Sequence, residues 1–192
     1  RYMIHRTATL IVNQDRRIIY YSPVMLLGLL GIKTIFDRKR KKAIVLLGTI
    51  LFIFTLYSMW GDPYGGWAFG PRYMIPAFAF LSIFLAGAIT AFGKKLWFKI
   101  LLSILFVYSA AINLLGALTT NQVPPKVEAV PLGLDWNFLL NWKMFTSGIT
   151  SSFFYKSYAT GIMPLYVYAG IILTLIVIAS LVLIWFPKGE KN

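Results

Sequence analysis

The chain has 192 residues, of which 58% are hydrophobic and 13% are charged, and its mean hydropathy is +0.71. This composition leaves too little polar surface to coat a water-soluble globule, so it predicts an integral membrane protein. The net charge of +13 does not indicate a nucleic-acid partner, because most of the basic residues gather in short loops between apolar runs. The excess of lysine and arginine in cytoplasmic loops of membrane proteins explains that pattern without any such partner.

Five apolar segments are expected to cross the membrane as helices, which predicts an all-α, polytopic helical bundle formed by one domain over residues 1–192. The first segment is the weakest, because Tyr20, Tyr21 and Pro23 suit an entry at the lipid headgroups. Small residues that favour close helix packing are Gly28, Gly31, Gly87, Ala88, Ala110, Ala111 and Gly170. The expected spans are residues 18–36, 43–60, 73–92, 97–118 and 164–186.

The basic loops predict the orientation of the bundle. Residues 38–42 are five consecutive cations, and Lys94, Lys95 and Lys99 surround the next turn on the same side. The positive-inside rule places these loops in the cytoplasm, and therefore 61–72 and 119–163 outside it. The expected location is a bacterial inner (plasma) membrane. Because the chain opens on Arg1 rather than methionine, we expect it to be the C-terminal part of a larger protein.

The outer segment 119–163 has about 45 residues, too long for a simple connector. Pro124, Pro125 and Pro131 predict an extended beginning. Residues 134–145, with Asp135 near the start, are typical of a short amphipathic helix that lies on the membrane surface.

The glycine-rich loop 61–72 carries the candidate chemistry, because it places Asp62 and Arg72 at the membrane surface beside several aromatic residues. Arg72 begins an apolar helix, where its guanidinium suits the phosphate of a lipid-linked ligand. The alternatives are a salt bridge from Asp62 to Arg72 that closes the turn, or an arginine that reaches ordinary lipid phosphates. The nearby aromatic residues form either an interfacial belt or the lining of a sugar site; they are Trp60, Tyr64, Trp67 and Tyr73.

No metal or nucleotide site is predicted. The chain has no cysteine, its single histidine is His5, and its glycines follow neither the P-loop nor the dinucleotide spacing. A magnesium or manganese ion is compatible with a phosphate-bearing substrate, but no cluster of ligands marks a place for it.

A resemblance rests on residues 60–77 and on the preceding stretch 21–31. This part of the chain resembles the multi-spanning bacterial glycosyltransferases of the GT-C superfamily, in the group similar to protein mannosyltransferases. The residues that carry it are Trp60, Gly65-Gly66-Trp67, Phe69-Gly70-Pro71-Arg72-Tyr73 and Pro76, with Tyr21-Ser22-Pro23 upstream. The similarity covers residues 18–92.

The resemblance implies an enzyme of the cell envelope that transfers a sugar from a polyprenyl-phosphate donor to an acceptor outside the cytoplasm. It implies that Arg72 contacts the donor phosphate, with Asp62 as an auxiliary polar group. The acidic residue that serves as base in that superfamily has no counterpart in this chain, so no catalytic base is assigned. Two other classes stay open: a transporter or flippase for lipid-linked or small polar substrates, and a non-catalytic membrane assembly protein.

Overall fold

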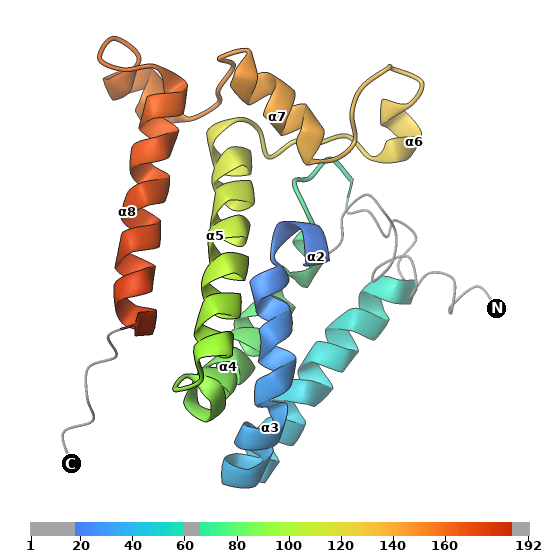
Figure 1. The fold of residues 1–192 in the computed structure, drawn as a ribbon. Helices are drawn as coiled ribbons and strands as arrows, with labels where there is room; N and C mark the ends of the chain where they lie inside the picture. The colour runs from blue at the N-terminus through green and yellow to red at the C-terminus, as the bar shows by residue number, and fades with distance from the viewer. Residues whose placement is uncertain (1–17, 60–65, 186–192) are drawn as a thin grey trace.

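A computed structural model describes residues 18–59 and 66–185 of the chain. These residues contain helices and no strand, which confirms the all-α class. The elements in chain order are α2 (Ile18–Tyr21), η1 (Pro23–Leu27), α3 (Gly28–Met59), η2 (Arg72–Met74), α4 (Ile75–Phe92), α5 (Leu96–Leu118), α6 (Lys126–Ala129), α7 (Phe138–Thr146), η3 (Tyr155–Ala159) and α8 (Leu165–Trp185). Figure 1 shows the long helices standing side by side, with α6 and α7 lying across one end.

Three helical segments of the described residues are long and apolar enough to cross a membrane: Arg72–Phe92, Leu96–Leu118 and Leu165–Trp185. They match the last three predicted segments within a few residues. The expectation of about five spans is therefore met only in part. The segment 18–36 is interrupted because Ser22 has a non-helical φ of −150° before Pro23, which separates α2 from η1.

The second predicted segment, 43–60, continues from the first through the basic residues as α3. Lys39 leaves the helical conformation with φ −146° and ψ 62°, and the helix bends there. Figure 1 shows the two arms of α3 diverging from this bend. The bend falls inside the run of cations at residues 38–42.

The first arm of α3 packs closely on α4 through glycine, as the sequence predicted for Gly28, Gly31 and Gly87. A side chain at Gly31 would collide with the backbone of Phe84 and Ala88. A Cβ at Gly28 would lie 2.8 Å from the carbonyl oxygen of Leu81, which also belongs to α4. Within residues 18–59 and 66–185 the prediction is wrong for Gly170, since no other helix comes within 4 Å of where its Cβ would be.

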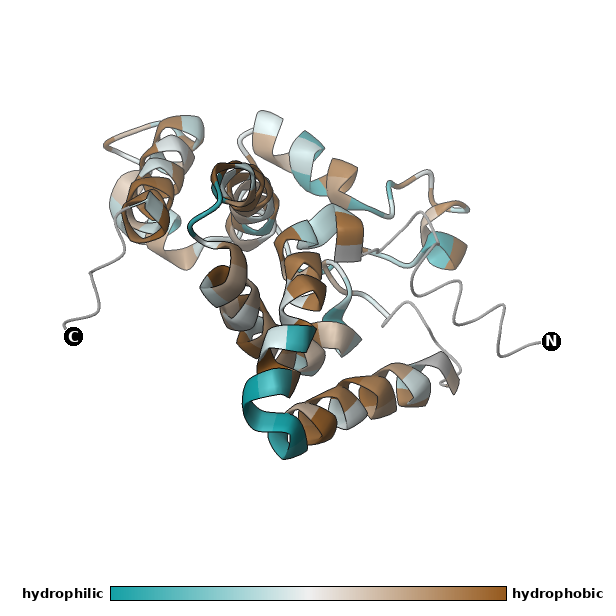
Figure 2. Cartoon of the chain, turned by 60° about the horizontal axis from the view of Figure 1, so that its bottom comes forward, coloured by the Kyte–Doolittle hydropathy of each residue, from teal (hydrophilic) through white to brown (hydrophobic). Residues whose placement is uncertain are grey.

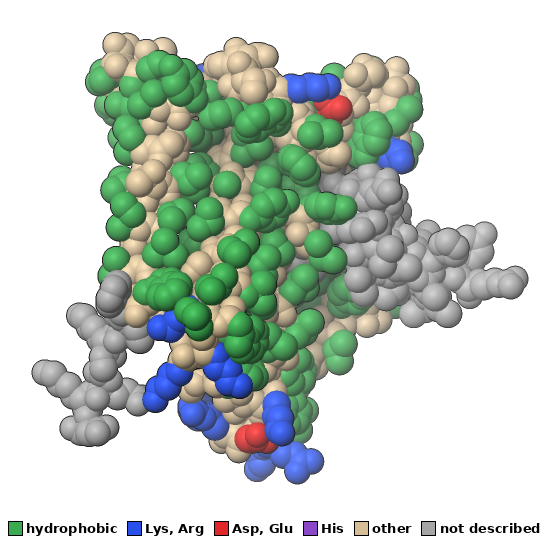
Figure 3. Space-filling model, viewed as in Figure 1, with side chains coloured by type: hydrophobic (Ala, Val, Ile, Leu, Met, Phe, Trp, Pro, Cys, Tyr) green, Lys and Arg blue, Asp and Glu red, His purple; other side chains and the backbone are tan. Residues whose placement is uncertain are grey.

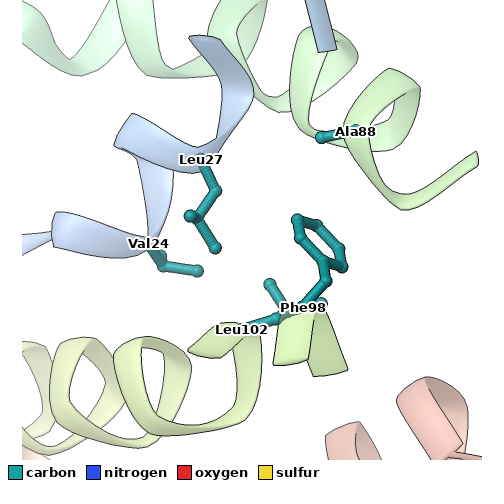
Figure 4. Close-up of a cluster of buried hydrophobic side chains, with 5 residues drawn as sticks. All are labelled: Val24, Leu27, Ala88, Phe98 and Leu102. Atoms are coloured by element: carbon teal, nitrogen blue, oxygen red, sulfur yellow. The ribbon is translucent and has the colours of Figure 1, made fainter. Parts of the chain in front are cut away.

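A small buried cluster joins η1, α4 and α5. It consists of Val24, Leu27, Ala88, Phe98 and Leu102. In Figure 4 the Phe98 ring lies between the η1 side chains and Ala88. Phe98 and Ala88 are fully buried, so these contacts fix the turn between α4 and α5 against η1.

The outer surface of the bundle is apolar, as expected for helices that contact lipid. Leu175 and Leu183 of α8 are 63% and 74% exposed, and only Leu165 and Ala169 of this helix are buried. Figure 3 shows hydrophobic side chains along the whole length of the bundle. Together with the three apolar helices, this surface supports a membrane protein.

The charged residues divide between the two ends of the bundle. Lysine and arginine gather at the end that holds the bend of α3 and the turn between α4 and α5 (Figure 3). Figure 2 shows the bend as the most hydrophilic part of α3. Arg72 and Lys94 lie at opposite ends of α4, so the basic turns and the glycine-rich segment are separated by the length of this helix.

The segment 119–163 forms short helices across the other end. α7 begins at Phe138, not at residue 134 as expected, because the side chain of Asn137 caps it by accepting a hydrogen bond from the Leu139 amide at 2.9 Å. Asp135 instead forms an ion pair of 2.5 Å with Lys143 of α7.

Candidate functional site

The described part of the glycine-rich loop, residues 66–71, is attached to the segment that follows α5. The amide of Ala68 donates a hydrogen bond of 3.0 Å to the carbonyl of Val123. The indole N–H of Trp67 donates one of 2.6 Å to the carboxylate of Glu128 in α6. Two segments far apart in the sequence are thereby held together at the end of the bundle.

The next two residues of the loop fill space in the bundle. The Phe69 ring meets the Tyr21 ring edge to face, with centroids 4.9 Å apart, and it occupies the place of a side chain at Gly116. Gly70 has φ +69°, and a Cβ there would lie 2.9 Å from the ring of Tyr21. Only glycine combines that backbone conformation with that close approach. Phe69 and Gly70 therefore position the chain through their packing on Tyr21 and Gly116.

Arg72 follows directly and begins η2, where its amide donates to the carbonyl of Gly70 at 3.0 Å. Its side chain is exposed. The guanidinium carbon lies 5.6 Å from the centroid of the Tyr73 ring. No carboxylate of residues 18–59 or 66–185 lies within ion-pair distance of it. Within this part of the chain, the guanidinium keeps its donors available for an anion.

Tyr73 connects Arg72 to α3. Its ring stacks on the ring of Tyr57 with centroids 4.4 Å apart and planes 3° from parallel. The guanidinium of Arg72, the ring of Tyr73 and the ring of Tyr57 therefore lie one against the next in space. This arrangement limits the positions open to the guanidinium. We call these three residues the Arg72 stack.

Of the residues predicted for this site, Trp67, Arg72 and Tyr73 are described, and they do not all share one role. Trp67 is 45% exposed and bound to Glu128, whereas Arg72 and Tyr73 belong to the stack. Trp60, Asp62 and Tyr64 lie outside the described residues. The predicted proximity of Asp62 to Arg72 thus stays a prediction.

The described acidic residues at this end are both engaged. Glu128 accepts from Trp67, and Asp135 pairs with Lys143. Neither forms an ion pair with Arg72. Within the described ranges, no three Asp, Glu or His side chains come together in a way that would hold a metal ion. The exposed guanidinium of Arg72 can bind an anion, and the described residues identify no base.

α7 is held on the end of α5 by a buried amide. The side-chain nitrogen of Asn141 donates to the hydroxyl of Thr119 at 2.8 Å and to the carbonyl of Thr120 at 2.7 Å. An apolar groove of about 300 Å³ lies between α5, α7 and α8, and Trp142, Phe145 and Tyr166 contribute to its walls. None of residues 66–73 lines this groove, so it is separate from the Arg72 stack.

Sequence reasoning missed Tyr57 and Asn141, and it named Glu128 only as one of the acidic residues expected outside the cytoplasm, without its partner. Each is defined by a partner distant in the chain: Trp67 and Glu128 are 61 residues apart, and Asn141 lies 22 residues from Thr119. No local sequence pattern predicts a contact between residues so far apart in the chain. For Tyr57, an aromatic near the end of an apolar segment was a signal, but an interfacial belt predicts the same residue.

Comparison with known proteins adds no relative: no family model, no curated protein and no solved structure matches the chain.

Proposed function

We propose that this chain belongs to a membrane glycosyltransferase that uses a polyprenyl-phosphate-linked sugar donor, and that Arg72 contacts the donor phosphate outside the cytoplasm. The observation that carries the proposal is the exposed guanidinium of Arg72, held against Tyr73 at the start of an apolar helix. Arginine donors of fixed geometry suit phosphate oxygens, and this one lies where a spanning helix begins.

The position of Arg72 at the start of an apolar spanning segment supports a lipid-linked ligand over a soluble one. The spanning segment that begins at Arg72 runs without another charged residue to Phe92. A phosphate carried on an isoprenoid chain places its charge at the membrane surface and its chain among such apolar helices. The aromatic rings of Tyr73 and Tyr57 add a flat surface of the kind on which sugar rings stack.

The polar residues within the helices argue against the alternative of a carrier. Thr49, Ser82 and Thr90 each donate their hydroxyl to a carbonyl of their own helix, at 2.9, 2.7 and 2.9 Å. The polar groups between the helices are also engaged, since Ser109 accepts from the Val24 amide and Asn113 donates to the Tyr21 carbonyl. A carrier for polar substrates or ions needs a polar route, with ionisable groups facing the bundle interior.

The binding step can be tested on the chain itself. The chain in lipid nanodiscs is titrated with polyprenyl phosphate, and the affinity of Arg72→Ala is compared with that of the unchanged protein. We expect a loss of about tenfold or more, the size of a hydrogen bond to a charged group. Arg72→Lys should recover part of the loss, because lysine keeps the charge but not the paired donors.

Lys126→Ala is the matched control, because Lys126 is a cation at the same end that also lies over an aromatic ring, 5.1 Å from the Trp136 centroid. Its affinity for polyprenyl phosphate should be unchanged. Unchanged binding by Arg72→Ala would refute the phosphate contact. The transfer step is tested in membranes that contain the protein, by the release of polyprenyl phosphate from a labelled donor; translocation of the intact donor without release would favour a flippase.

A further inference from the structure

A second cavity lies at the bend of α3, at the other end of α4 from Arg72. Its volume is about 670 Å³, within the range of about 300–1,000 Å³ that is typical of ligand sites. Its walls are of two kinds. The apolar wall consists of Ile35, Val45, Leu46 and Ile83, and the basic rim consists of Arg38, Lys39, Lys41 and Lys42.

The bend itself creates this cavity. Lys39 departs from helical geometry, and the two arms of α3 diverge from it (Figure 1). Ile35 on the first arm is fixed against α4, since its Cγ1 lies 2.8 Å from where a Cβ of Gly87 would be. Val45 and Leu46 lie on the second arm, and Ile83 comes from α4. Three helical segments thus enclose apolar surface directly beneath the cations.

The charge of the rim is not balanced by the described residues. All four cations of the rim are exposed, and none forms an ion pair with a described carboxylate. Asp37 is next to Arg38 in the chain but does not line the cavity. Figure 3 shows the blue side chains gathered around this bend. The rim therefore favours an anionic group, and phosphate accepts hydrogen bonds from lysine and arginine alike.

We propose that this cavity binds one anionic phospholipid, with its phosphate among the cations of the rim and the start of its acyl chains against the apolar wall. A free phosphate would satisfy the rim but leave the apolar wall in water. A zwitterionic lipid would cover the wall but add no net charge to the rim. An anionic phospholipid matches both surfaces, and its chains continue into the bilayer along α4.

The bend of α3 offers a control variant, because Arg40 belongs to the same run of cations but does not line the cavity. The full chain in detergent is titrated with phosphatidylglycerol, and bound lipid is counted by native mass spectrometry. Arg38→Gln and Lys42→Gln should each lower the affinity about fivefold, the effect of one basic residue near an anionic lipid. Arg40→Gln removes the same charge and should lower it much less. Equal losses for all three would show diffuse attraction and overturn the site.

The apolar wall is tested without any change of charge. Leu46→Trp fills the cavity and should lower the affinity for phosphatidylglycerol, whereas Leu51→Trp, at a 64% exposed position on the same arm that does not line it, should not. Unchanged binding by Leu46→Trp would overturn the role of the wall. Competition by inorganic phosphate at the concentration of the lipid would identify a site for soluble phosphate, and equal binding of phosphatidylcholine would remove the role of charge. Either result would overturn the proposal.

Discussion

Trp67 and Glu128 are joined by a hydrogen bond of 2.6 Å between the indole nitrogen and a carboxylate oxygen, which ties the glycine-rich segment to α6. Both side chains are exposed, so water competes for each partner. A backbone hydrogen bond from Ala68 to Val123 also links the glycine-rich segment to the residues that precede α6. The hydrogen bond between Trp67 and Glu128 therefore orients the segment that leads into Arg72 more than it stabilises the fold.

A double-mutant cycle with Trp67→Phe and Glu128→Ala measures this link. We expect a coupling free energy of about 0.5–1 kcal/mol, because a charge-assisted hydrogen bond at an exposed site is weakened by solvent. Thermal unfolding in detergent gives the free energies of unfolding of the unchanged protein, the two single variants and the double variant. The same cycle with Asp135→Ala in place of Glu128→Ala should give no coupling, and a coupling of equal size there would contradict the specific contact.

Gly31 makes the closest approach between α3 and α4, so it should be the glycine least tolerant of substitution. Gly31→Ala should lower the free energy of unfolding by about 1–3 kcal/mol, because the added methyl group meets the backbone of Phe84 and Ala88, which cannot rotate away. Unfolding in detergent by titration with dodecyl sulfate measures the change. Gly48→Ala, on the same helix with nothing within 4 Å, is the control and should not destabilise the protein.

The long apolar segments were the part of the fold that sequence reasoning located well. α4, α5 and α8 coincide with predicted segments, because a run of apolar residues of that length has few other stable conformations in a membrane. The sequence did not predict the break before Pro23, and it did not predict that one bent helix would join the first two segments at Lys39. Their geometry depends on how the first arm of α3 packs on α4, which hydropathy does not encode.

The sequence predicted the site only where a residue could be recognised by its own charge and position in the chain. Arg72 stood out by its charge and position, and the structure places it exposed at the start of the spanning segment. Phe69 and Gly70 belong to the same motif, yet they pack on Tyr21 and Gly116. A motif read along the chain does not separate residues that build the loop from residues that face a ligand, because that difference depends on contacts from other helices.

Asn141 should control the attachment of α7. Its side chain is fully buried and donates to Thr119 and Thr120 at the end of α5. Asn141→Ala leaves these acceptors without their donor, and we expect a loss of about 1–3 kcal/mol. Hydrogen exchange of the α7 amides should become faster. Asn121→Ala, at an exposed position, is the control; equal exchange rates in the two variants would show that the buried amide does not hold the helix.

The absence of cysteine makes the arrangement of the two ends directly measurable, since each introduced thiol is the only one in the chain. Lys94→Cys lies before α5 and Ser147→Cys lies after α7, so the two thiols should react with a membrane-impermeant maleimide from opposite sides of a sealed vesicle. The reason is that Leu96–Leu118 separates them and is long and apolar enough to span the membrane. If the positive-inside rule sets the orientation, Lys94→Cys should be protected in intact cells and Ser147→Cys labelled. Labelling of both from one side would mean that α5 does not cross, and labelling of Lys94→Cys alone would place Arg72 on the cytoplasmic face and contradict the proposed donor site.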